Sequence, residues 1–231
     1  MRHRIFVDKI ESAVVVTGDE FHHSVRVVRI RAGEEVEVFD RDGNAARGVV
    51  MALEKDRAVI TTTEMLPSRE SPLVLHLAMS IIVLEKFELV LQKATELGVR
   101  SFIPLVTDRI ELRRERYSGK MERWNKIVFE AVKQSGRTRV PRIQEPAATA
   151  DVLARPGTKI VFDADEPPSA LERLEGEATL LIGPEGGWSE EELRLARDRE
   201  CFFQRLGPRR LRAETAAIVA ASVMSSRFGD L

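Results

Sequence analysis

The chain has 231 residues, of which 43% are hydrophobic, and this is enough for a sizeable core in one or two domains. No apolar stretch approaches the roughly 20 residues that cross a bilayer, and a single cysteine, Cys201, excludes an internal disulfide and fits a reducing compartment. We therefore expect a soluble cytoplasmic protein with no membrane contact, and a net charge of −1 argues against a non-specific nucleic-acid binder.

The N-terminal part, up to about residue 66, has the pattern of short strands. Segments rich in β-branched residues predict strands at 14–17, 35–39 and 58–62. A short helix is expected from Gly18 to Val28, because apolar residues recur there with a period near 3.6. Together these elements predict a small closed β-barrel. The polar stretch Pro67–Pro72 marks its end, so we expect domains at 1–70 and 71–231.

From Leu73 onwards, strands and helices alternate, which is typical of a mainly parallel α/β sheet. Strands are predicted at 73–79, 101–106, 158–163, 179–182 and 202–206. Helices are predicted over 85–97, from near Ser118, from Ser189 and over 213–225. Ser189 and Glu192 form a capping box. The last helix has a face of small residues, which permits close packing within a chain or between two chains; these are Ala216, Ala217, Ala220 and Ala221.

Several kinds of catalytic site are excluded by residue usage. The histidines are His3, His22, His23 and His76, so none lies in the glycine-rich C-terminal part of the chain. A Ser-His-Asp triad or a Cys-His pair cannot form within that part. Zinc sites built from paired cysteines and histidines are excluded, and we expect no metal. The phosphate-binding patterns G-x-x-x-x-G-K-[ST] and G-x-G-x-x-G are also absent.

The loop Gly183–Gly187 (Gly-Pro-Glu-Gly-Gly) follows a predicted strand and precedes a predicted helix. Ligands of open α/β sheets bind at such strand ends. Glu185 lies inside the loop and Glu190–Glu192 lie in the first turn of the helix, so an anionic pyrophosphate would meet only carboxylates there. We infer a ligand that is adenine-like or cationic. S-adenosylmethionine (SAM), a sulfonium without phosphate, meets that demand.

A second glycine turn, Leu206–Arg212, again joins a strand to a helix. Two such turns after adjacent strands can form two walls of one pocket. Arg212, Glu214 and Thr215 then stand at the start of the final helix, where side chains and backbone donors converge. The alternative is that Arg212 and Glu214 are ordinary cap and surface residues.

Basic residues gather in three groups without acids: Arg26, Arg29 and Arg31; Lys133–Arg142; and Arg205–Arg212. Such segregation can place a positive face for nucleic acid on a nearly neutral protein. The alternative is that these residues are ordinary solvated surface charges.

Four motifs in this order resemble the RsmE family of small-subunit ribosomal RNA uridine N3-methyltransferases, in the SPOUT superfamily. The motifs are EKFELVLQKATELGV (85–99), QSGRTRVP (134–141), LLIGPEGG (180–187) and LGPRRLRAETA (206–216). The resemblance spans essentially the whole chain. It implies an α/β SPOUT domain whose C-terminal segment forms a trefoil knot, preceded by a PUA-like β-barrel. It also implies SAM as cofactor, 16S ribosomal RNA of the small subunit as substrate, and a homodimer.

The resemblance further implies which residues bind SAM, whereas we assign the catalytic residues from the chemistry of uracil N3 and the RNA-binding residues from the basic clusters. The SAM-binding residues would be Phe162, Leu181, Ile182, Gly183, Glu185, Gly186, Gly187, Leu206, Gly207, Leu211 and Ala216. The catalytic residues would be Arg212, Arg137 and Glu214, the arginines stabilising a uracil that has lost its N3 proton and Glu214 or Glu185 accepting that proton. The RNA-binding residues would be Arg26, Arg29, Arg31, Arg139 and Arg142.

Three other functions stay open at this point. A non-catalytic RNA-binding assembly factor on the same scaffold would fail to bind SAM. A ribose 2′-O-methyltransferase, or an enzyme acting on transfer RNA, would keep the cofactor but methylate another atom. A nucleotide-phosphate enzyme is opposed by the glutamates at 190–192.

Overall fold

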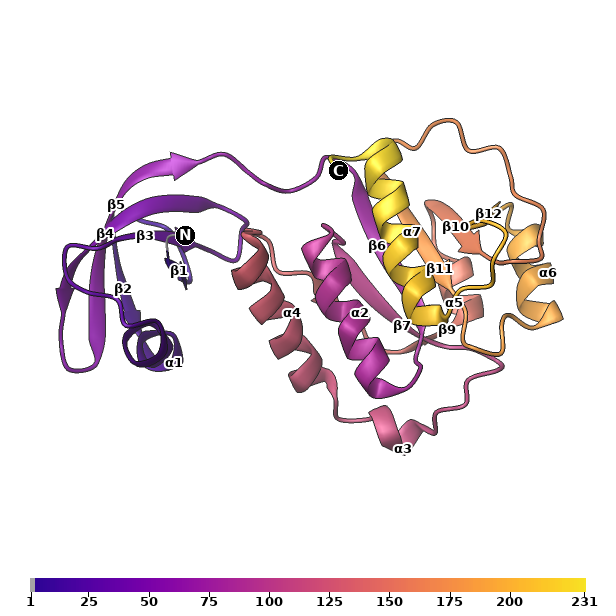
Figure 1. The fold of residues 1–231 in the computed structure, drawn as a ribbon, viewed down its shortest axis with the longest axis horizontal. Coiled ribbons are helices and arrows are strands. Elements are labelled where there is room, and N and C mark those ends of the chain that lie inside the picture. Colours follow the sequence, from indigo (N-terminus) through magenta and orange to yellow (C-terminus); the bar gives the residue numbers. More distant parts are fainter. Residues whose placement is uncertain (1–2) are drawn as a thin grey trace. The chain divides into compact units, whose positions relative to one another are not determined.

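The computed structural model describes residues 3–231 and, apart from that of Arg114, their side chains (Figure 1). The chain forms two compact units. The N-terminal unit runs through Glu70 and includes a second segment, Val132–Val140. The α/β unit comprises Ser71–Ala131 and Pro141–Leu231. The domains 1–70 and 71–231 stay a prediction, which did not place Val132–Val140 with the N-terminal residues.

The N-terminal unit is a five-stranded sheet in the order β1-β3-β4-β5-β2. Its strands are β1 (His3–Phe6), β2 (Ala13–Thr17), β3 (Glu35–Phe39), β4 (Ala45–Leu53) and β5 (Arg57–Leu66). β1 pairs with β3 in parallel, and the other pairs are antiparallel. Among the described residues β1 and β2 do not pair, so the sheet is a half-barrel and the closed barrel that we expected is wrong.

A helical segment covers the core that the open sheet leaves accessible. Its Phe21 belongs to the same buried cluster as the inward-facing Val14, Val36 and Ile60 of the strands. The single helix predicted here is in fact an α-helix, α1 (Gly18–His22), followed by a π-helix, η1 (His23–Val28). The segment ends at Arg29, whose φ of 61° is left-handed.

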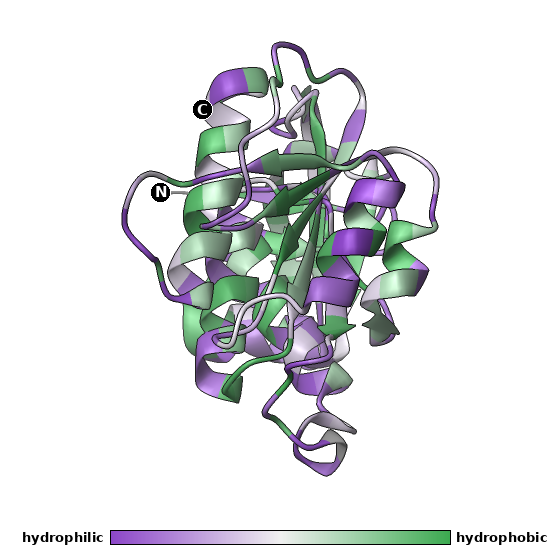
Figure 2. Ribbon diagram, turned by 90° about the vertical axis from the view of Figure 1, so that its right-hand side faces the viewer, coloured by the Kyte–Doolittle hydropathy of each residue, from purple (hydrophilic) through white to green (hydrophobic). Residues whose placement is uncertain are grey.

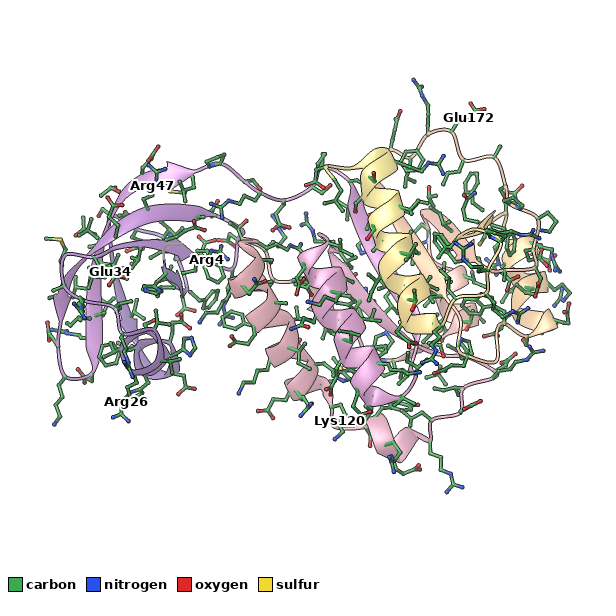
Figure 3. All side chains as sticks on the ribbon, viewed as in Figure 1. Arg4, Arg26, Glu34, Arg47, Lys120 and Glu172 are labelled. Atoms are coloured by element: carbon green, nitrogen blue, oxygen red, sulfur yellow. The ribbon has the colours of Figure 1, made fainter. Side chains whose placement is uncertain are left out.

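The segment Val132–Val140 is held in the N-terminal unit by charged side chains. Arg4 donates to the carbonyl oxygens of Val132 (2.8 Å), Lys133 (3.2 Å) and Arg137 (2.7 Å). Figure 3 shows Arg4 beside the end of the helix that leads into this segment. Glu70 accepts from the Arg137 guanidinium at 2.6 Å and from the backbone N–H of Thr138 at 3.1 Å. These contacts satisfy the polar backbone of a segment that has no strand partners.

The α/β unit contains a parallel sheet in the order β12-β10-β11-β6-β7-β8, with the short β9 also paired to β7. The mainly parallel sheet predicted from the sequence is confirmed. Its strands are β6 (Val74–Ser80), β7 (Ser101–Val106), β8 (Arg142–Ile143), β9 (Ala147–Ala148), β10 (Thr158–Phe162), β11 (Glu177–Ile182) and β12 (Phe202–Gln204). The two-residue strands β8 and β9 are too short to give a periodic signal in the sequence.

Helices cover both faces of this sheet, as Figure 2 shows, and the strands between them are hydrophobic. The helices are α2 (Leu84–Glu96), α3 (Arg114–Tyr117), α4 (Met121–Ser135), α5 (Thr149–Leu153), α6 (Glu190–Asp198) and α7 (Ala213–Phe228). α2 and α7 lie side by side on one face (Figure 1). α5 and α6 pack on the other, where Leu153, Leu193 and Ala196 meet the strand residues Val161 and Leu181.

The C-terminal segment returns from the edge of the sheet to its middle. β12 is the edge strand beside β10, yet α7, which follows it, packs on α2, β6 and β11. This path is compatible with the trefoil knot, which stays a prediction. The small residues Ala217, Ala220 and Ala221 are fully buried within the chain, which accounts for the small-residue face without a second copy.

No helix within residues 3–231 is long and apolar enough to cross a membrane. The described part of the chain also holds no cluster of histidine, cysteine and acidic residues that would bind a metal ion.

Candidate active site at the strand ends

Three strands of the α/β unit end side by side. In the sheet register, Phe162 of β10 lies opposite Ile182 of β11 on one side and Gln204 of β12 on the other. The two glycine turns therefore leave the sheet on either side of Phe162. We expected them to follow adjacent strands, but β10 lies between β11 and β12. The carboxyl ends of parallel strands are where α/β proteins bind ligands.

The first turn is shaped by two of its glycines. The N–H of Gly187 donates to the carbonyl of Pro184 at 3.0 Å, and Gly187 has a φ of 71°, where a side chain is strained. A Cβ at Gly183 would come within 3.1 Å of the Trp188 ring. Buried Trp188 in turn donates from Nε1 to the carbonyl of Phe162 at 3.1 Å. This hydrogen bond fixes the turn to the end of β10.

The start of α6 is already satisfied by the chain itself. The predicted capping box between Ser189 and Glu192 is confirmed. The Glu192 carboxylate is buried and also accepts from the Thr149 hydroxyl at 2.6 Å and from the Asp108 N–H at 3.3 Å. Since carboxylates occupy this helix start, it offers little to a phosphate, which supports the argument made from the sequence.

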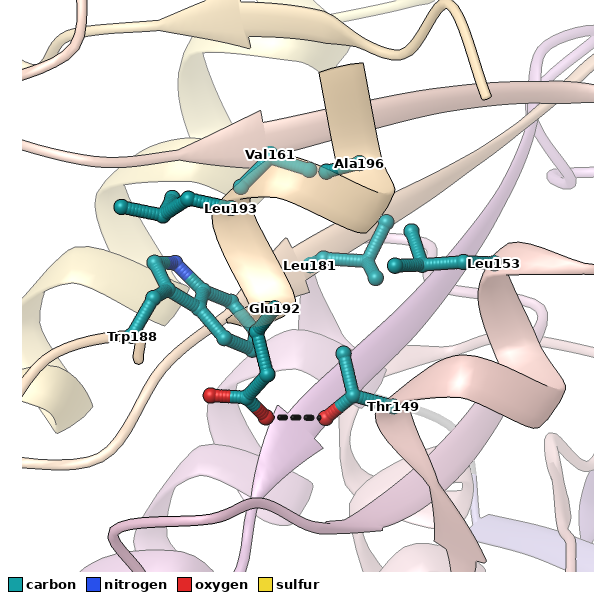
Figure 4. A pocket seen from close by; sticks show the side chains of 8 residues that line it. All are labelled: Thr149, Leu153, Val161, Leu181, Trp188, Glu192, Leu193 and Ala196. Atoms are coloured by element: carbon teal, nitrogen blue, oxygen red, sulfur yellow. Dashed lines mark hydrogen bonds between the residues drawn. The ribbon is translucent and has the colours of Figure 1, made fainter. Parts of the chain in front are cut away.

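A small hollow beneath α6 is part of the core and has no room for a water molecule (Figure 4). Apolar side chains and the Thr149–Glu192 hydrogen bond line it. The lining residues are Thr149, Leu153, Val161, Leu181, Trp188, Glu192, Leu193 and Ala196. It is therefore not the ligand site.

The second turn is tied to the loop after β10. Arg205 donates from Nε to the carbonyl of Glu166 at 2.7 Å, and Arg210 pairs with Asp165 at 2.8 Å. Gly207 has a φ of 97°. The turn ends at Arg212, the N-cap of α7, whose carbonyl accepts from the N–H of Ala216 at 2.8 Å and whose side chain is exposed.

A lysine joins the first turn to α7. Lys86 Nζ lies 3.4 Å from Glu214 Oε1 and 3.9 Å from Glu185 Oε1. The other oxygen of Glu214, Oε2, is buried and no hydrogen bond reaches it from the described residues. A buried acceptor without a donor is unfavourable, so this atom is left wanting a donor or a positive charge that the described residues do not supply.

The predicted SAM-binding residues thus lie at one edge of one unit, on the ends of β10 and β11, on the two turns and on the first turns of α7. Leu181, Ile182 and Gly183 are buried supports, whereas Glu185, Gly186 and Gly207 are exposed. The glycine turns and the acidic side chains suit a cationic adenosyl ligand. Glu214 and Arg212 of the catalytic set lie at the same edge.

Arg137 lies elsewhere, in the N-terminal unit. Its side chain is 5% exposed and is paired with Glu70. Its present contacts are structural, and its predicted catalytic role stays a prediction.

The predicted RNA-binding arginines are all exposed. Arg26 on η1 projects from the N-terminal unit (Figure 3), and Arg29 and Arg31 follow it along the chain. Arg139 donates to the carbonyl of Asp42 at 3.3 Å in the same unit, whereas Arg142 begins β8 in the α/β unit.

Sequence reasoning missed two supporting residues, Lys86 and Trp188. One feature of the sequence could have pointed to Lys86, because a cation in the first turn of a helix is unfavourable next to the positive end of the helix dipole. Trp188 had no such feature, since a tryptophan after a glycine turn is an ordinary core residue.

Comparisons with known proteins identify the family of the chain. Residues 69–225 match a family model described as an RNA methyltransferase domain, and residues 16–63 match an RNA methyltransferase PUA domain. Ribosomal RNA small subunit methyltransferase E of Bacillus subtilis is 33% identical over 226 residues, which cover 91% of this chain and 88% of that protein.

Solved structures are similar over the full length. The crystal structure of ribosomal RNA small subunit methyltransferase E from Neisseria gonorrhoeae bound to S-adenosyl methionine has a TM-score of 0.91 at 30% identity and covers 100% of both chains. A methyltransferase from Legionella pneumophila in complex with SAM has a TM-score of 0.88 at 31% identity, again over 100% of both chains. With two domain matches and relatives of this similarity, the chain belongs to the ribosomal RNA small subunit methyltransferase E (RsmE) family.

Proposed function

We propose that this protein transfers a methyl group from SAM to N3 of one uridine in 16S ribosomal RNA of the small subunit. The observation that carries the proposal is the strand-end site, where two glycine turns flank Phe162 and meet the acidic start of α7. Its support comes from relatives that are named for small-subunit ribosomal RNA methylation and solved with SAM bound. The uridine N3 target and a cytoplasmic location rest on the family resemblance.

Different residues of the site bind the cofactor, stabilise the negative charge on the uracil and accept its proton. The two turns and Phe162 would hold SAM, which when bound supplies a methyl group on a positively charged sulfur. Uracil N3 must lose its proton before it can attack, and the resulting charge spreads onto the two ring oxygens. The Arg212 guanidinium is suited to stabilise that charge by charge-assisted hydrogen bonds. Glu214, with Glu185 as the alternative, accepts the proton.

A substitution in the first turn tests the cofactor site. Gly187→Ala places a side chain at a φ of 71°, which introduces about 1–2 kcal/mol of backbone strain. The turn should shift to relieve that strain. We expect the Kd of SAM, measured by calorimetry, to rise roughly tenfold. Gly98→Ala is the matched control, because Gly98 has a φ of 90° and open space around it but lies at the end of α2. Equal SAM affinity in the two variants would show that the turn does not hold the cofactor.

The exposed arginines of the N-terminal unit are proposed to grip RNA phosphates. Replacing Arg26, Arg29 and Arg31 by glutamine should reduce the slope of log K for RNA against log salt concentration by about 2. The rate at saturating RNA should stay the same, because phosphate contacts position the substrate without taking part in the chemistry. Arg57→Gln, which removes an exposed partner of Glu54 in the same unit, serves as the control. An unchanged slope in the triple variant would place the RNA elsewhere.

A homodimer is also proposed, on the resemblance alone. Light scattering of the purified chain gives its mass directly, and a monomer would contradict this part of the proposal.

The decisive experiment supplies labelled SAM and unmodified small ribosomal subunits, followed by nucleoside analysis. Label in 3-methyluridine is the expected result. Label in a ribose-methylated nucleoside would keep the cofactor and change the target atom. No transfer together with no SAM binding would favour a non-catalytic RNA-binding factor.

A further inference from the structure

Lys86 occupies a position that helix electrostatics disfavours. It is the third residue of α2, where the unpaired N–H groups of the helix repel a cation. A residue that breaks a local rule is expected where another interaction compensates. The compensation here comes from two acids on other elements of the α/β unit.

The two acids are not equivalent partners. Glu214, in the first turn of α7, is 13% exposed and has its Oε1 3.4 Å from Lys86 Nζ. Glu185, in the first glycine turn, is 35% exposed and lies at 3.9 Å. The Lys86–Glu214 ion pair is shorter and less exposed to solvent, so it is the stronger of the two because water screens it less. Lys86 therefore holds Glu214 first and Glu185 second.

This arrangement gives the two oxygens of Glu214 different surroundings. Oε1 faces the ammonium of Lys86, whereas Oε2 is buried and accepts no hydrogen bond from the described residues. Because Oε1 is held, the direction in which Oε2 points is fixed as well. The natural partner of Oε2 is a donor that the described residues do not provide.

We propose that Lys86 is a positioning residue for methyl transfer, which aims Glu214 Oε2 at the N3–H of the substrate uracil and links it to the cofactor turn through Glu185. This inference rests on the proposed function. The N3 proton passes to Oε2, and the electron pair left on N3 forms the bond to the methyl carbon. The carbon–sulfur bond breaks with its pair remaining on sulfur, and the Glu214 carboxylic acid then releases its proton to water.

The test compares three variants of the full chain with unmodified small subunits as substrate. Lys86→Met removes the ammonium but keeps the aliphatic stem, and kcat should fall roughly 100-fold, the cost of a misplaced catalytic group. The KM for SAM and the thermal midpoint should stay near their wild-type values. Lys86→Arg keeps the charge and should recover most of kcat. Lys93→Met is the control, because Lys93 lies on the same helix and pairs with Glu96 outside the site.

A double variant shows whether Lys86 acts through Glu214. Glu214→Gln alone should lower kcat, and adding Lys86→Met should lower it little further. Additive losses would overturn the inference, as would a wild-type kcat in Lys86→Met. A change confined to the KM for SAM would make Lys86 a cofactor ligand, and a loss that follows the thermal midpoint would make it structural; both also overturn it. If the wild-type chain forms no 3-methyluridine, the proposed function itself fails.

Discussion

Replacing Arg212 by alanine is expected to lower kcat for methyl transfer by about 100- to 1,000-fold, with the Kd of SAM close to wild type. Arg212 caps α7 with an exposed side chain, two residues before Glu214 and at the end of the second glycine turn. Its guanidinium is needed when N3 has lost its proton and the ring oxygens carry negative charge. Single-turnover assays with saturating cofactor would measure this step directly.

Two further variants separate charge from geometry. Arg212→Lys keeps the positive charge but loses the planar pair of donors, so its rate should lie between those of alanine and arginine. Arg173→Ala removes an exposed arginine of the same unit near the opposite end of β11 and should have no effect. Full activity of Arg212→Ala at saturating SAM would remove Arg212 from the mechanism.

The second large effect concerns stability. Arg137→Ala should lower the free energy of unfolding by about 3–5 kcal/mol, because it leaves a buried carboxylate without its counter-ion. That carboxylate is Glu70, whose side chain is only 9% exposed. Urea denaturation followed by circular dichroism measures the loss. Arg139→Ala, an exposed neighbour in the same segment, should cost far less.

This variant also decides between the two roles of Arg137. A folded Arg137→Ala protein of wild-type stability that had lost its methyl-transfer rate would establish the predicted catalytic role, which is to stabilise the deprotonated uracil. A destabilised protein that keeps its rate at low temperature would establish the structural role that the Glu70 pair indicates.

The same ion pair predicts a dependence on pH. Burial alone raises the pKa of Glu70, but the Arg137 ion pair and the N–H donors of Arg139 and Thr138 outweigh it, so the pKa lies below its usual value of 4.5. A carboxylate with a depressed pKa stabilises the fold above the unfolded pKa and loses that contribution as pH falls through the folded value. The free energy of unfolding should therefore fall with pH below about 4.5, and less steeply in Glu70→Gln.

Local patterns were sufficient for most elements of the α/β unit. The apolar period of α2, the small-residue face of α7, the capping box at Ser189 and the strand–turn–helix pattern at Gly183 are all short-range signals. In the N-terminal unit they predicted β2, β3 and β5 but not that the sheet stays open, with Phe21 and Ile30 in its buried core. Alternation along a strand shows that one face is buried, but it does not show whether the first and last strands meet.

For the site, the sequence identified the turns but not what holds them. The glycines and the acid of Gly183–Gly187 are neighbours in the chain, so a ligand-binding turn can be predicted there from the local sequence alone. The contact of Lys86 with Glu214 joins residues far apart in the chain, as does the pairing of Arg137 with Glu70. Such pairs depend on the tertiary path, so no spacing rule predicts them.

The N-terminal unit is built from two separate segments of the chain, and this affects how it can fold during synthesis. A nascent chain that has reached residue 70 carries Arg4 and Glu70, but the groups of Val132–Val140 that these two side chains bind are still unmade. Domains generally fold as they leave the ribosome, the N-terminal one first. Here the first unit must wait for residues 71–131 to be translated before it can bury those charges. A chain ending at residue 70 would therefore lack part of its own interior.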